Sequence, residues 1–177
     1  MHANMRCHRD SPRPFIHGGR DFERSFLLHA ATDREWKEFV RMKPALQRAG
    51  LTKENYFDWA RRNQPEGWNP CCPTTRMARE FFEKVRSKLD REHRGKLRMY
   101  VATGTPLDFD AGTDFWLELN GEKVTFDITI NPHKKKRRRS TNFILQIWHL
   151  ASRKLENFAR KIAGLIKYKL RLAAAAS

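Results

Sequence analysis

The pair Asn120-Gly121, between two runs of alternating apolar and polar residues, constrains the fold more than any other feature of the chain. Asn-Gly is typical of a two-residue β-hairpin turn, because both turn positions adopt positive φ angles. Such a turn fixes the register of the two strands. This register places Leu119 opposite Glu122. Three further predicted pairs are chemically sensible: Glu118 with Lys123, Leu117 with Val124, and Phe115 with Phe126.

The same register places Asp114 opposite Asp127 on the polar face of the hairpin, with Cβ atoms about 4.5–5.5 Å apart. Two opposed like charges destabilise a sheet, and Asp is a poor strand former. A divalent cation would remove the repulsion, since carboxylate oxygens are ligands that Mg²⁺ prefers. Asp114 and Asp127 are therefore candidate ligands of Mg²⁺ or Mn²⁺. The alternative is a solvated face, on which one Asp pairs with a lysine or caps a neighbouring segment.

Net charge indicates the kind of partner. The 177 residues carry 36 Lys and Arg against 20 Asp and Glu, a net charge of +16. Most of this charge lies between residues 133 and 171, which hold 13 Lys and Arg and a single acid, Glu156. A polyanion is the expected partner. An apolar content of 40% favours a folded domain over a disordered basic tail.

A run of six consecutive cations follows the predicted hairpin: Lys134, Lys135, Lys136, Arg137, Arg138 and Arg139. Its place in the sequence predicts a loop at the end of the sheet near the aspartates. We interpret it as a contact to nucleic-acid phosphates. A solvated loop and a nuclear targeting signal are the alternatives.

The segments Gly112-Thr113-Asp114 and Phe126-Asp127-Ile128-Thr129 resemble the two motifs of the PD-(D/E)xK nuclease superfamily. The resemblance spans about residues 74–165. It implies an α+β fold with a restriction-endonuclease-like core of helix, β-meander and helix. It also implies a metal-dependent endonuclease that acts on DNA in preference to RNA, with Mg²⁺ or Mn²⁺ as cofactor.

The resemblance also assigns roles to individual residues. Asp114 and Asp127 would hold the metal, and Glu80, on the preceding helix, would join them as a catalytic residue. Thr129 stands where the family has a lysine; Thr129 or a nearby lysine, such as Lys123, would orient the attacking water. Gln146 would contact nucleic acid from the helix after the metal strand. Because the motif lysine is missing, the alternative is a non-catalytic nucleic-acid-binding protein, either an inactive nuclease-like fold or a structural RNA-binding subunit.

The rest of the chain divides into an arm with short helices over 1–69 and a nuclease-like core with a basic C-terminal helix over 70–177. Capping residues and apolar spacing predict helices from Thr32 or Asp33 to Gly50, from Thr52 to Pro65, and from Thr74 or Thr75 to about His93. Residues 96–104 and two further runs within 105–132 read as strands. From Thr141 to about Leu172 the pattern predicts a helix, interrupted near Gly164.

Several classes of protein are disfavoured by the sequence. No apolar run approaches 18 residues, so we expect no membrane span and no membrane partner. The three cysteines lack zinc-ligand spacing, and their odd number favours a reducing compartment. We expect a protein of the cytoplasm, associated with the nucleoid, or of the nucleus in a nucleated cell. The oligomeric state stays open, with a homodimer as one option.

Overall fold

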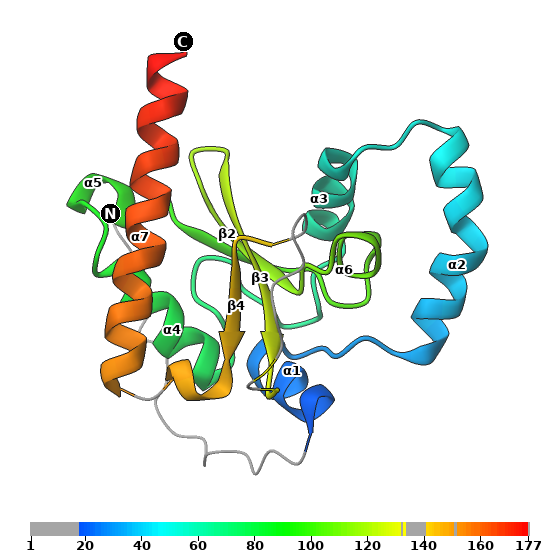
Figure 1. The fold of residues 1–177 in the computed structure, drawn as a ribbon, viewed down its shortest axis with the longest axis horizontal. Coiled ribbons are helices and arrows are strands. Elements are labelled where there is room, and N and C mark those ends of the chain that lie inside the picture. Colours follow the sequence, from blue (N-terminus) through cyan, green and yellow to red (C-terminus); the bar gives the residue numbers. More distant parts are fainter. Residues whose placement is uncertain (1–17, 132, 134–140, 151, 177) are drawn as a thin grey trace.

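The computed structural model describes residues 18–131, 133, 141–150 and 152–176. Its centre is a four-stranded mixed sheet in the order β1-β2-β3-β4 (Figure 1). The strands are β1 (Arg98–Val101), β2 (Phe115–Leu119), β3 (Glu122–Thr129) and β4 (Phe143–Gln146). The first three form an antiparallel meander, and β4 runs parallel to β3. Helices and a mixed sheet in one chain agree with the predicted α+β class.

The β2–β3 hairpin has the predicted register. Phe115 pairs with Phe126, Leu117 with Val124, and Leu119 with Glu122. Asn120 and Gly121 both have positive φ, 50° and 85°, as a turn of this type requires. The rings of Phe115 and Phe126 stack with their centroids 4.5 Å apart. Turn chemistry and the alternating pattern therefore suffice to fix this part of the sheet.

One face of the sheet packs against three helices: α1 (Gly19–Leu27), α4 (Arg76–Arg86) and α7 (Ser152–Ala175). Phe81 of α4 lies at the centre of this core, with ring centroids 5.9 Å from Phe26, 5.7 Å from Phe115 and 5.6 Å from Phe126. Before residue 32 the sequence predicted an arm with no more than one helical turn at its end. Phe22, Phe26 and Leu27 are fully buried, which explains why a helix forms there.

The opposite face is covered by α3 (Lys53–Arg62) and α6 (Pro106–Ala111). The fully buried Trp116 has its ring centroid 5.1 Å from that of Phe57 and 4.9 Å from that of Tyr100. Two helices lie further out: α2 (Asp33–Arg48) and the short α5 (Arg91–Arg94). The sheet thus has a hydrophobic core on each side.

Residues 143–146 form β4, and a 3₁₀ turn η1 (Ile147–Leu150) follows, so the helix predicted from Thr141 is wrong up to α7. A short apolar run such as this cannot be assigned to strand or helix by periodicity alone. The predicted interruption near Gly164 is also wrong, because α7 runs unbroken to Ala175. Ala163 and Ile166 are buried beside Gly164, and this packing outweighs the cost of about 1 kcal/mol for a helical glycine.

Two further observations concern membrane-spanning helices and the cysteines. Among the described residues, no helix combines the length and the apolarity needed to cross a membrane. Cys71 is an exposed free thiol, whereas Cys72 is disulfide-bonded, which the odd cysteine count did not predict.

Candidate active site

Asp114 lies immediately before β2, and the backbone holds it on two sides. Its carbonyl oxygen accepts a hydrogen bond from the Ala102 amide (2.8 Å), and its own amide donates to the Phe126 carbonyl (2.8 Å). The Asp114 Oδ2 atom accepts a hydrogen bond from the Ile128 amide (2.6 Å). Asp114 is only 7% exposed, so the alternative of a solvated face is wrong for this residue.

The segment before Asp114 explains its burial. It was predicted to be extended, but residues 106–111 form the helix α6, with Pro106 in its first turn and Gly112 at its C-terminal cap in the left-handed region. Pro near the start and Gly just after the end are the positions these residues favour in helices. This helix ends three residues before Asp114, and it brings a second acid, Asp108, beside the Asp114 carboxyl group.

Asp108 is therefore a site residue that the sequence reasoning missed. Its Oδ2 atom accepts a hydrogen bond from the Gly104 amide (2.9 Å), and its carboxyl group is hydrogen-bonded to that of Asp114. Burial, together with repulsion from Glu23 and Asp127, raises the pKa of Asp108 to about 7, against the opposing effect of these hydrogen bonds. Asp108 thus titrates close to neutral pH in the folded protein.

The pKa of Asp114 is raised well above its ordinary value. Burial is the main cause, and repulsion from Asp108 and Asp127 adds to it, while the hydrogen bond from Ile128 acts in the opposite direction. Two carboxyl groups joined by a hydrogen bond cannot both be ionised without a large cost. Ionisation of either carboxyl group therefore raises the pKa of the other.

Four acids from four parts of the fold make up what we call the acidic cluster: Glu23 of α1, Asp108 of α6, Asp114, and Asp127 of β3. Asp127 is half-buried and is the register partner of Ile144 on β4. The prediction that Asp114 and Asp127 lie close together agrees with the repulsion between them. Glu23 has no sequence motif, and only the packing of α1 brings it here.

Thr129 and Gln146 are brought together at the carboxyl ends of β3 and β4. They are register partners in the parallel pair. The Thr129 hydroxyl accepts a hydrogen bond from the Asn131 amide (3.0 Å), and the Gln146 side chain donates to the Asn131 carbonyl (3.3 Å). Thr129 shares a strand face with Asp127, because side chains alternate along a strand. The predicted helical position of Gln146 is wrong, since this residue ends a strand.

Two other predicted participants lie elsewhere. Glu80 is exposed on α4 and forms an ion pair with Arg76 (3.0 Å), and it is not among the main causes of either aspartate shift described above. Lys123 was considered as a replacement for the motif lysine. Its ammonium contacts Glu54 of α3 at 2.6 Å, and it lies four residues before Asp127, about 13 Å along the strand. Glu23, from α1, is the glutamate that adds to the repulsion at Asp108 and Asp114.

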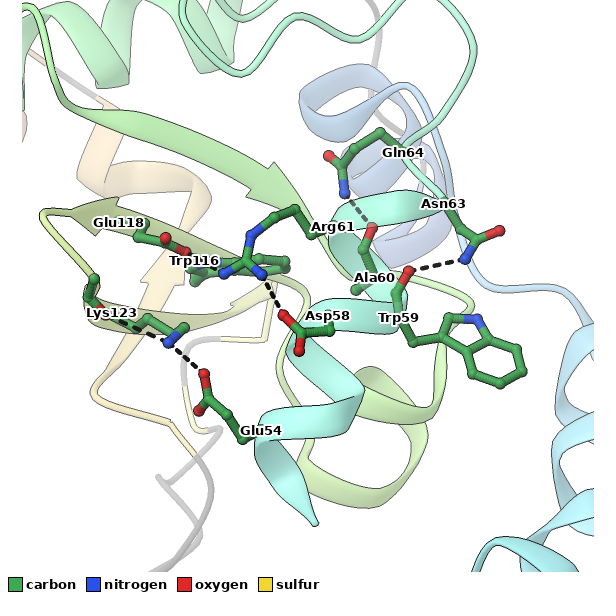
Figure 2. A network of polar contacts seen from close by, with 11 residues as sticks. Glu54, Asp58, Trp59, Ala60, Arg61, Asn63, Gln64, Trp116, Glu118 and Lys123 are labelled. Atoms are coloured by element: carbon green, nitrogen blue, oxygen red, sulfur yellow. Dashed lines mark hydrogen bonds and ion pairs between the residues drawn. The ribbon is translucent and has the colours of Figure 1, made fainter. Parts of the chain in front are cut away.

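The predicted pairing of Lys123 with Glu118 is also replaced by contacts to α3. Although the two residues are neighbours in the register, Glu118 contacts Arg61 (2.9 Å) and Lys123 contacts Glu54 (Figure 2). Arg61 also forms an ion pair with Asp58. We call Glu54, Asp58, Arg61, Glu118 and Lys123 the paired cluster.

The cationic run Lys134–Arg139 lies outside the described residues. Its neighbours in the chain are described: Ile130 and Asn131 follow β3, and Thr141 and Asn142 precede β4. Since β3 and β4 are parallel, the connection that contains the run begins at the strand end that carries Thr129.

The acids of the cluster are of the right chemistry for a hard divalent cation, which binds to one or two carboxylates and completes its shell with water and phosphate oxygens. Within the part of the chain that the structure describes, no three His, Cys, Asp or Glu side chains are already arranged around a metal position. Comparison of the chain with known protein families, curated proteins and solved structures found no match.

Proposed function

We propose that this protein is a metal-dependent phosphodiester nuclease that acts on DNA, with a restriction-endonuclease-like core of the PD-(D/E)xK type. The acidic cluster is the observation that carries the proposal. Burying a carboxyl group costs free energy unless a partner compensates, and here the buried Asp114 and the partly buried Asp108 have each other as neighbours. Acids whose pKa is raised by burial and by like charges are typical of functional sites.

Each residue of the acidic cluster and its neighbours would have a separate role in the reaction. Asp114, oriented by the Ile128 amide, and Asp127 would bind Mg²⁺ or Mn²⁺. When bound, such an ion polarises a phosphate oxygen and lowers the pKa of a water molecule. The hydroxyl of Thr129, on the same strand face as Asp127, would orient this water. Gln146, beside Thr129, would contact the DNA, and Lys134–Arg139 would bind the flanking phosphates.

Asp108 adds a role that the family resemblance does not assign. Its pKa of about 7 suits proton transfer at neutral pH. Cation binding to Asp114 would release to solvent any proton held between the two carboxyl groups. We therefore expect metal affinity to increase as the pH rises through neutrality.

Cleavage of supercoiled plasmid DNA in Mn²⁺ tests the proposal. We expect the wild type to nick or linearise the plasmid, and Asp114→Asn and Asp127→Asn to lose detectable cleavage. Asp110→Asn is a matched control, because Asp110 is on the same helix as Asp108 but is exposed and paired with Lys43 (2.6 Å). The control should cleave as the wild type does. Equal cleavage by all four proteins would refute the proposal.

The second candidate is a nucleic-acid-binding protein without catalysis, which Thr129 in place of the motif lysine favours. This candidate predicts DNA or RNA binding by the wild type in Mn²⁺ with no cleavage. Neutralising the six cations from Lys134 to Arg139 should weaken binding under either proposal, with a loss of about 0.9 in the log–log salt slope for each phosphate contact removed.

A further inference from the structure

The helix α2 is the least buried long helix of the fold. Of its 16 residues, only Phe39 is buried. Figure 1 shows α2 at the edge of the molecule, well separated from the sheet and joined by extended segments. It rests on α6, where the rings of Phe39 and Trp36 lie 5.4 Å and 5.3 Å from that of Phe109. Since most helices in proteins are stabilised by packing, a helix that buries so little has a large surface open to a partner.

The outward face of α2 is basic. Four cations recur at helical spacing on one side: Arg34, Lys37, Arg41 and Arg48. This stripe is about 21 Å long, from the helical rise per residue. Lys37, Arg41 and Arg48 form no ion pair with any described residue, whereas Arg34 contacts Glu38 at 3.0 Å. Arg34, Lys37, Glu38 and Arg41 line a shallow depression of about 430 Å³.

Two acids of α2 contact residues that precede the helix, and the third, Glu38, pairs with Arg34 within it. Asp33 contacts Arg20 at 2.7 Å, and Glu35 contacts His29 at 3.0 Å. Val40 lies beside the basic stripe and is 49% exposed, whereas Trp36, 48% exposed, lies on the side that packs on α6. The outward face therefore combines three cations that have no described ion pair with the exposed side chain of Val40.

We propose that this outward face of α2 binds the phosphate backbone of duplex DNA, as a contact surface separate from the acidic cluster. The inference rests on the proposed function for the identity of the partner as DNA. A stripe of about 21 Å spans roughly six base pairs of duplex, which carries one phosphate charge per 1.7 Å or so of its axis. Because α2 packs on α6, which carries Asp108, the stripe is one helix away from the acidic cluster.

A pair of double variants tests the surface. Lys37→Gln with Arg41→Gln removes two cations of the stripe that have no described ion-pair partner. Arg91→Gln with Lys96→Gln removes the same two residue types, also exposed and without a described ion pair, at the far side of the molecule near α5 (Figure 1). Binding of a fluorescein-labelled DNA duplex is measured by anisotropy in chelator, over a range of salt concentrations, so that cleavage cannot interfere.

We expect the α2 variant to bind about 30-fold more weakly at physiological salt, and its log–log salt slope to be shallower by about 1.8, for two lost phosphate contacts. The control variant should keep the wild-type affinity within a small factor. Equal weakening by both variants, or wild-type binding by the α2 variant, overturns the inference.

The same measurements separate this inference from the proposed function. If the wild type cleaves plasmid but the α2 variant binds as the wild type does, only the inference fails. If the α2 variant loses affinity and the wild type never cleaves, the inference stands and the proposed nuclease activity fails. A wild type that binds no duplex overturns both.

Discussion

The acidic cluster and the paired cluster lie at opposite ends of β3. Both bring carboxyl groups close together, but they differ in how the negative charge is compensated. In the paired cluster, Lys123 and Arg61 contact the carboxylates of Glu54, Asp58 and Glu118. In the acidic cluster, Asp108 and Asp114 contact each other, and their pKa values rise as a result of burial and repulsion. The first arrangement stabilises the fold. The second costs stability, which is why we assign function to it.

The largest effect on stability should come from Asp108→Asn. A carboxyl group that keeps its proton to about pH 7 in the folded state, but loses it near pH 4 when unfolded, makes the protein less stable as the pH rises between these values. Asn removes this loss, so the variant should exceed the wild type at pH 8 by up to about 4 kcal/mol. Urea unfolding at pH 4, 6 and 8 measures the difference. A constant difference at all three values would contradict the assignment.

Arg61→Ala should lower the free energy of unfolding by disrupting the paired cluster. The guanidinium contacts both Asp58 and Glu118, and the Glu118 side chain is only 17% exposed. Removing one partner of a partly buried ion pair leaves a carboxylate without compensation, at a cost of about 2–3 kcal/mol. Lys53→Ala, on the same helix, is the control for loss of a cation and should cost less. Urea unfolding at pH 7 compares the two.

The parts of the fold that the sequence predicted are those governed by local chemistry. Asn120-Gly121 specifies the turn and with it every β2–β3 pair, and the Thr32 and Thr75 caps mark the starts of α2 and α4. The acidic cluster was predicted only for Asp114 and Asp127. Pro106 and Gly112 signalled the helix that carries Asp108, but the neighbouring alternating pattern favoured a strand. Glu23 could not be found locally, because it reaches the site through the packing of Phe22 and Phe26.

Gly121→Ala tests the turn, with a smaller expected effect. Gly121 has φ +85°, and no atom lies within 4 Å of an added Cβ, so the penalty is backbone strain alone. We expect a loss of about 1–2 kcal/mol. Gly95→Ala is the control, since Gly95 is equally open but has no positive φ. Thermal melting of both variants decides the point, and equal melting temperatures would speak against a strained turn.

The smallest expected effect is a change in the pKa of Asp108, and it distinguishes Glu23 from Glu80. Repulsion from Glu23 raises the pKa of Asp108, so Glu23→Gln should lower this pKa. Glu80→Gln should leave it unchanged, because Glu80 pairs with Arg76 on the exposed side of α4. Titration of the Asp108 carboxyl carbon by NMR measures both. A fall with Glu80→Gln and none with Glu23→Gln would restore the prediction made from sequence.

The most direct test of the central claim is thermal melting of the wild type, Asp114→Asn and Asp127→Asn, first in chelator and then in Mn²⁺. In chelator each variant should be as stable as the wild type or more stable, because a neutral isostere removes repulsion. At an Mn²⁺ concentration 100 times Kd, the wild type should gain about 2.7 kcal/mol, and neither variant should match this gain. A wild type without a Mn²⁺-dependent rise, variants that gain as much, or a variant that melts far below the wild type in chelator would contradict the claim that these aspartates form a metal site.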